Sequence, residues 1–374
     1  MEIPFVYGKI AEGQDFTDRE DDGKKLLDNF HGLVNTVIIS PRRWGKTSLV
    51  NRVLGKIRDE KDYLLCKIDI FNCRTEAQFF QSYANAILSA SYTKIDEFLH
   101  AVKKYLSSFG PKISLSDIGA QFELGVGIDF RDNTYSYDEI LDLPQKIAEE
   151  RGVKFIVCID EFQNVSSYHD SIGFQRKLRS HWQNHSQVGY CIFGSKRHML
   201  LDIFSNYQMP FYKFGDIMFL DKISKENWIK YITNRFLSTG KIIADTTAGK
   251  IADYVDCHPY YVQQLAQISW LRTEKVCDDK IVDDAFSSLV SQLSLLFSNI
   301  ADSLTARQIQ FLRAIANGET MFSSATVIKN YDLGTSANVI NLKKALQDKD
   351  LIDIWAKEIT IQDPLFAFWI KNVY

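Results

Sequence analysis

The residues VIISPRRWGKTSLVNRVL, from Val37 to Leu54, form the most informative stretch of this sequence. The first residues are β-branched, and a segment from Thr47 to Ile57 has apolar residues at helical spacing. A strand, a tight loop and a helix in this order direct backbone N–H groups and a helix N-terminus at one anion. The stretch therefore predicts a phosphate-binding loop, with Ser40 where the pattern G-x-x-x-x-G-K-[ST] has its first glycine.

The residue types in this loop suit a nucleoside triphosphate. Gly45 has no Cβ beside the phosphates, Lys46 can reach the β- and γ-phosphates, and the Thr47 hydroxyl can ligate Mg²⁺. A chance G-K-T sequence is the alternative, but the flanking strand and helix count against it. The predicted nucleotide-binding residues of the loop are Arg42, Arg43, Trp44, Gly45, Lys46, Thr47 and Ser48.

A second stretch, FIVCIDEFQNV, has the form of a buried strand that ends in two acids, Asp160 and Glu161. We expect Asp160 to hold Mg²⁺ and Glu161 to orient or deprotonate the attacking water. The pair could instead cap a helix, but the upstream loop counts against that interpretation. The D-E ending favours hydrolysis of a nucleoside triphosphate over phosphoryl transfer to a small molecule. The sequence has no N-K-x-D guanine-binding motif, so the expected ligands are ATP and ADP with Mg²⁺.

Composition indicates a globular protein without a membrane span. The 374 residues include 45% hydrophobic and 24% charged residues, with a net charge of −3. No apolar run approaches the roughly 20 residues that span a bilayer. The amino terminus lacks the layout of a signal peptide, and the six cysteines are scattered without a C-x-x-C pair. We therefore expect a cytoplasmic protein with reduced cysteines and no membrane partner.

Strand-like and helix-like segments alternate in the first half of the chain, which predicts an α/β fold with a parallel sheet covered on both faces. Strict alternation of apolar and polar residues between Gln121 and Phe130 adds an inserted β-hairpin, for which the sequence suggests no function. The predicted strands are residues 34–39, 63–71, 154–160 and 189–195, and helices are expected at 47–57, 76–90 and 96–106.

Helical patterns replace the strands from about residue 217 to residue 300. Three further helices and a short hairpin then follow, which is the layout of a winged helix. The predicted domains are a P-loop ATPase core at 1–216, an all-α lid at 217–300 and a winged-helix domain at 301–374. The winged helix has eight basic and eight acidic residues, whereas a DNA-binding module usually carries an excess of positive charge.

Two further groups of residues have positions or spacings that are typical of functional sites. Arg197 follows the fourth strand and could sense the terminal phosphate, and Lys196 is the neighbouring candidate. The alternative is that these are solvated charges at the start of a helix.

His181 and His185 have the spacing of a zinc-binding helix. They lack the glutamate of H-E-x-x-H and a third ligand, so we interpret KLRSHWQNH as a surface helix face.

The chain resembles the archaeal-type P-loop ATPases of the STAND branch, which are relatives of the AAA+ proteins. The resemblance covers essentially the whole chain and rests on several motifs together. These are DFTDREDD at Asp15–Asp22, PRRWGKTSL, IDEFQ, CHPYYVQQLA at Cys257–Ala266 and the ending DPLFAFWIK. Ser40 and Cys257 depart from the family pattern, which has glycine at the first position and often at the second.

The resemblance implies roles for residues outside the loop. Asp18 and Arg19 would lie along the adenine or ribose, while Arg42 and Arg43 would border the phosphates. Arg197 matches the family's sensor arginine. His258 and Pro259, from the lid, would contact the base or the β-phosphate.

Three functions fit these features. The favoured one is a slowly hydrolysing ATPase that acts as a conformational switch for a partner protein or for self-assembly; the resemblance implies signalling, stress or defence roles. The second is a DNA-acting ATPase whose winged helix binds DNA. The third is an ATP-binding scaffold with vestigial hydrolysis.

Overall fold

The computed structural model describes residues 3–11, 13–106, 112–118, 121–127 and 137–374. The chain forms two compact units. We call the first the core unit, which comprises Arg19–Ser40 and Lys46–Leu220. The second, the C-terminal unit, comprises Met1–Asp18, Pro41–Gly45 and Asp221–Tyr374.

The core unit is built on a five-stranded sheet with the order β2-β5-β6-β1-β7, in which all neighbouring strands are parallel. The parallel sheet and its four predicted strands are confirmed. A fifth strand was missed because it has only four residues, begins with an acid and is mostly half-exposed. The strands are β1 Thr36–Ile39, β2 Tyr63–Asp69, β5 Lys154–Asp160, β6 Val188–Gly194 and β7 Asp216–Phe219.

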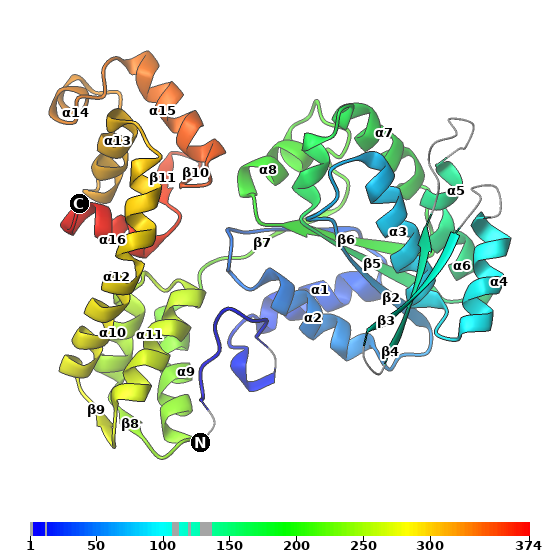
Figure 1. The fold of residues 1–374 in the computed structure, drawn as a ribbon, viewed down its shortest axis with the longest axis horizontal. Coiled ribbons are helices and arrows are strands. Elements are labelled where there is room, and N and C mark those ends of the chain that lie inside the picture. Colours follow the sequence, from blue (N-terminus) through cyan, green and yellow to red (C-terminus); the bar gives the residue numbers. More distant parts are fainter. Residues whose placement is uncertain (1–2, 12, 107–111, 119–120, 128–136) are drawn as a thin grey trace. The chain divides into compact units, whose positions relative to one another are not determined.

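Both faces of this sheet are covered by helices, as continuous apolar strands require. All residues of β1 and β6 are buried. In Figure 1, α1 and α2 lie on one side of the sheet, and α7 and α8 lie on the other. The helices of this unit are α1 Glu20–His31, α2 Lys46–Ile57, α3 Glu76–Ser91, α4 Ile95–Leu106, α5 Asp138–Leu141, α6 Leu143–Arg151, η3 Phe162–Ser167, α7 Ser171–Trp182 and α8 Arg197–Ser205.

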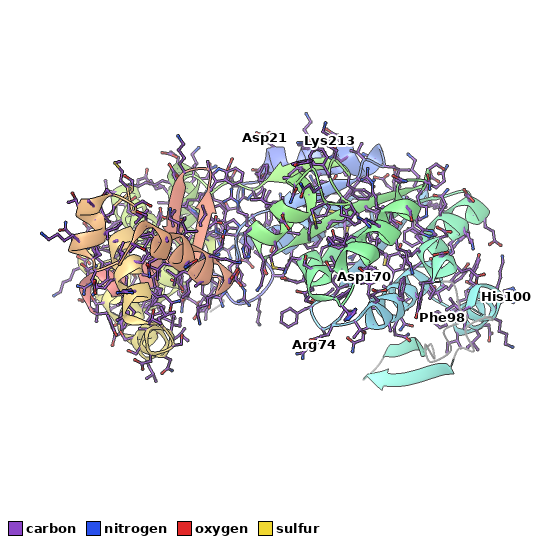
Figure 2. All side chains as sticks on the ribbon, turned by 90° about the horizontal axis from the view of Figure 1, so that it is seen from above. Asp21, Arg74, Phe98, His100, Asp170 and Lys213 are labelled. Carbon is purple, nitrogen blue, oxygen red and sulfur yellow. The ribbon has the colours of Figure 1, made fainter. Side chains whose placement is uncertain are left out.

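The excursion between β2 and β5 contains the predicted helix and hairpin. On α4, Phe98 is buried and His100 is exposed, as the apolar stripe predicts (Figure 2). The hairpin pairs β3 (Lys112–Ile118) with β4 (Gln121–Gly127) in antiparallel register, which confirms that element. The end of the predicted alternation, at residues 128–130, lies outside the described residues, as do the hairpin side chains up to residue 126.

Within the C-terminal unit, residues 221–302 are mostly helical, as expected for the lid. It also contains a two-residue parallel pairing, Ile242 with Val276 and Ile243 with Cys277, that was not predicted. Its elements are η1 Gly13–Asp15, α9 Lys225–Leu237, β8 Ile242–Ile243, α10 Asp245–Tyr254, α11 Pro259–Arg272, β9 Val276–Cys277 and α12 Asp279–Asp302. No helix among the described residues is long and apolar enough to cross a membrane.

The end of the chain has the three helices and hairpin of a winged helix, which confirms the prediction. A last helix begins at Pro364, and the Asp363 carboxylate caps it by accepting the N–H groups of Leu365 and Phe366. The elements are α13 Ala306–Ala316, α14 Ala325–Asn330, α15 Ser336–Asp348, β10 Ile352–Trp355, β11 Glu358–Ile361 and α16 Pro364–Asn372.

The entry into β7 leaves no space for a side chain at Gly215. A Cβ there would lie 2.0 Å from the backbone oxygen of Asn35, so Gly215→Ala should lower the free energy of unfolding. We expect a loss of about 2–4 kcal/mol. In Gly55→Ala, the control within α2, the new Cβ meets nothing within 4 Å, and helix propensity should add up to about 1 kcal/mol. Urea unfolding tests the pair, and equal shifts would contradict the prediction.

Candidate active site

The topology of the core unit brings the predicted loop and the predicted acids to one edge of the sheet. The carboxyl ends of parallel strands meet at the same edge, where α/β proteins bind their ligands. β6 lies between β1, which leads into the loop, and β5, which ends at Asp160. Residues after β6 therefore stand between the two predicted halves of the site.

Lys46 is the first residue of α2 and is held by the residue that opens the loop. Its Nζ donates to the backbone oxygen of Ser40 at 3.1 Å and lies 3.3 Å from the Ser40 Oγ. Both side chains are buried. The serine at the usual glycine position therefore contributes an oxygen to the lysine. Gly45 has φ 87°, a left-handed conformation that favours glycine, so this second glycine is required by the backbone.

The Thr47 hydroxyl and the Asp160 carboxylate lie together, as the predicted Mg²⁺ site requires. The Thr47 hydroxyl donates to Asp160 Oδ2 at 3.1 Å. Burial, followed by the charge of Glu161, raises the pKa of the Asp160 carboxyl to about 6, so a cation beside it would favour its ionised form. Among the described residues no three His, Cys, Asp or Glu side chains form a metal cluster. One carboxylate and one hydroxyl fit Mg²⁺, which takes its other ligands from phosphates and water.

Glu161 follows β5 in a left-handed conformation, with φ 57°. Such a conformation is uncommon for a residue with a side chain and is often found at functional sites. Its Oε2 accepts a hydrogen bond from Gln163 Nε2 and another, of 2.9 Å, from Ser195 Oγ. No sequence pattern predicted a role for Gln163 or Ser195. The signal that could have found them is their position, since Gln163 closely follows the acidic pair and Ser195 directly follows β6.

Arg197 and Lys196 lie where the sequence placed them, directly after β6. Lys196 precedes α8 and Arg197 is its first residue, and both side chains are half-buried. Contact between Arg197 and a γ-phosphate stays a prediction.

Asp18 and Arg19 both have positive φ, 62° and 74°, which turns the chain into α1. Arg19 is buried, and its Nη1 contacts Asp22 Oδ2 at 3.2 Å. Its Nη2 is also buried and has no hydrogen-bond partner among the described residues. Buried donors are normally paired, so this nitrogen is suited to a further acceptor. The role of Asp18 and Arg19 in holding adenine or ribose is not tested by these contacts.

In the C-terminal unit, His258 is the residue before α11 and Pro259 is its first residue. The His258 ring is buried, and its Nδ1 has no hydrogen-bond partner among the described residues. Burial lowers the pKa of His258 to about 4, and the charges of Arg43 and Lys222 act in the same direction. Arg43 also lies over the Tyr260 ring at 4.4 Å. A neutral ring with an open nitrogen can accept or donate one hydrogen bond.

The depressed pKa of His258 predicts a loss of stability in acid. The unfolded histidine takes up a proton as pH falls below about 6.5, whereas the folded one stays neutral until about pH 4. The free energy of unfolding should therefore fall with pH across this window, by about 2 kcal/mol between pH 7 and pH 5. Calorimetry of nucleotide-free wild type and His258→Gln checks this, because the variant should lack that part of the loss. Parallel pH profiles would contradict the assignment.

His181 and His185 do not form the surface helix face that we expected. His185 is only 3% exposed in its side chain, and both rings bind the Asp142 carboxylate, at 2.8 Å and 3.1 Å. Burial opposes ionisation of Asp142, but the two histidines outweigh it and lower its pKa. The prediction failed because Asp142 lies 39 residues before His181 in the chain. The same contacts join both histidines to one carboxylate.

The whole chain resembles solved P-loop ATPases in fold. A Walker-type ATPase of Pyrococcus abyssi has a TM-score of 0.67 with 18% identity, covering 98% of this chain and 99% of its own. The ORC2 protein of Aeropyrum pernix, solved in ADPNP–ADP complexes, has a TM-score of 0.57 with 13% identity, covering 99% and 97%. Residues 295–372 match a family described as a probable winged helix domain. The chain has the fold of the archaeal P-loop ATPases with a C-terminal winged helix.

This P-loop ATPase fold confirms the resemblance at the level of architecture. The ORC1 protein of Aeropyrum pernix, solved in complex with DNA, has a TM-score of 0.51 with 12% identity, covering 96% of this chain and 93% of its own. No curated protein matches the chain in sequence. Identities this low establish the fold alone.

Proposed function

We propose that this protein binds ATP with Mg²⁺ and hydrolyses it slowly, as a nucleotide-driven switch for a partner protein or for a second copy of the chain. The observation that carries the proposal is the arrangement at the edge of the core sheet. Lys46 lies against Ser40, Thr47 lies against Asp160, and Glu161 is held beside them by two donors. These are the groups needed to bind a triphosphate and to activate water.

Each residue has a role in this proposal. The loop N–H groups and Lys46 bind the phosphates, and Thr47 and Asp160 hold Mg²⁺. The metal, when bound, neutralises charge on the phosphate oxygens. Glu161 accepts the proton of the attacking water. Arg197 contacts the γ-phosphate, which is the part of ATP that ADP lacks.

Arg42, Arg43, Trp44, Gly45 and Ser48 complete the proposed phosphate loop. Asp18 and Arg19 bind adenine or ribose in this proposal, and His258 and Pro259 contact the base or the β-phosphate. Contacts that depend on the γ-phosphate would bias a hinge near residues 215–220 and so change the surface offered to a partner. We also propose a cytoplasmic location, which is supported by six free cysteines.

A DNA-acting ATPase is the second candidate. The solved ORC1–DNA complex has the same fold, and the exposed residues Asn341 and Lys344 on α15 could contact phosphates or bases. Two observations count against it. The winged helix has no excess of positive charge, and Lys343 lies 5.6 Å from the centre of the Phe322 ring.

Steady-state ATP hydrolysis with and without duplex DNA separates the two candidates. Turnover below about one per minute that DNA leaves unchanged supports the switch, as in GTPases, whose unassisted turnover is slow. A severalfold increase with DNA, lost at higher salt, favours the DNA-acting enzyme. In that case, replacing Lys343 and Lys344 by glutamate should abolish the increase. Unchanged stimulation in this variant would exclude α15 as the DNA contact.

A further inference from the structure

Gln163 is a buried polar residue next to the proposed catalytic carboxylate. It lies in η3 (Phe162–Ser167), two residues after Glu161, and is 1% exposed. Its Nε2 donates to Glu161 Oε2. Its Oε1 is buried and has no hydrogen-bond partner among the described residues. A buried amide with one unpaired oxygen is costly, and the one side-chain hydrogen bond that Gln163 makes among the described residues goes to Glu161.

The two donors on Glu161 bind the same oxygen. Gln163 Nε2 and Ser195 Oγ both contact Oε2, the latter at 2.9 Å. Two donors from different segments fix the plane of a carboxylate more tightly than one. They also leave the acceptor capacity of Oε1 for a water molecule, since an ionised carboxylate has about four acceptor positions.

The position of Gln163 depends on Gly194, the last residue of β6. A Cβ on Gly194 would lie 1.9 Å from Gln163 Oε1 and 3.1 Å from its Cδ. The amide therefore occupies the space that a side chain at residue 194 would take. Because Gln163 is buried, it has little room to move elsewhere. Gly194 thus leaves room for Gln163, and the next residue, Ser195, supplies the second donor to Glu161.

We propose that Gln163 is a positioning residue for ATP hydrolysis, orienting Glu161 so that Oε1 faces the attacking water. The inference rests on the proposed function. Water attacks the γ-phosphorus, the bond from that phosphorus to the bridging oxygen breaks, and its electron pair leaves with ADP. The proton of the water passes to Glu161 Oε1, and phosphate is the second product. Gln163 takes no proton and acts only through the geometry of Glu161.

The first test replaces the amide without changing its length, in Gln163→Met. We expect kcat to fall about tenfold or more with KM unchanged, because the catalytic carboxylate is no longer oriented. The matched control is Gln175→Met in α7. Gln175 is also fully buried, has one hydrogen bond, to Ser171 Oγ at 3.3 Å, and has an unpaired Oε1 among the described residues. It should keep kcat.

Gly194→Ala provides a second route, because it displaces Gln163 without removing its amide. The same fall in kcat is expected, with binding of a fluorescent ATP analogue retained in both variants. Retained binding also shows that the variants are folded. A fall in kcat no greater than that of Gln175→Met would overturn the inference.

The decisive measurement is a double-mutant cycle with Glu161→Gln. If Gln163 acts through Glu161, Gln163→Met should change the residual single-turnover rate of Glu161→Gln by less than about twofold. An undiminished tenfold effect in that background would overturn the inference and leave the proposed function standing. Wild-type protein without hydrolysis, or Glu161→Gln with wild-type turnover, would overturn both.

Discussion

Replacing Lys46 by alanine should abolish ATP hydrolysis and weaken ATP binding. Lys46 is buried at the start of α2, and its Nζ is held 3.1 Å from the Ser40 backbone oxygen at the mouth of the loop. A cation fixed there needs little rearrangement to meet the β- and γ-phosphates. We expect kcat/KM to fall by about 100-fold or more, the range for removal of one preorganised electrostatic group.

The matched control for Lys46→Ala is Lys56→Ala, in the last turn of the same helix, where the lysine is exposed. It removes the same charge from the same element and should leave hydrolysis and binding unchanged. Hydrolysis by malachite-green phosphate release and affinity by titration with a fluorescent ATP analogue check both variants. Equal activity of Lys46→Ala and wild type would mean that any hydrolysis occurs at another site or comes from a contaminant.

Replacing Glu161 by glutamine should separate binding from chemistry. Glutamine has the same shape and can still accept the hydrogen bond of Ser195, so Mg²⁺ and ATP binding should persist. It cannot take a proton from water, so we expect turnover to fall by about 100-fold or more. The variant should therefore accumulate in its ATP-bound state. That state is needed to find a partner that recognises ATP-bound protein.

The control for this variant is Glu97→Gln, which neutralises an exposed carboxylate on α4 in the same unit. Single-turnover hydrolysis of radiolabelled ATP measures the chemical step, and equilibrium binding measures affinity. Unchanged turnover in Glu161→Gln would remove Glu161 from the chemistry. If the variant also kept the full cellular phenotype, the protein would be better described as an ATP-binding scaffold.

Most of the fold could be predicted because its signals are local. The four predicted strands are largely apolar runs, and the helices have apolar residues at their own spacing. The exceptions are short elements, which contain too few residues to show a period. β7 has four residues, and β8 and β9 have two each. The predicted end of the core at residue 216 falls within β7 for this reason, and the two units divide after Leu220.

The sequence by itself determined the residue types that carry the proposed chemistry: the loop with Lys46 and Thr47, the acids Asp160 and Glu161, and the winged helix. Each of these motifs consists of residues that lie close together in the chain, so the local pattern is enough to predict it. Only the tertiary structure decided which groups hold them. Ser195 lies 34 residues after Glu161, and they meet because β6 is placed beside β5. Strand order depends on packing across the whole sheet, which no short stretch of sequence encodes.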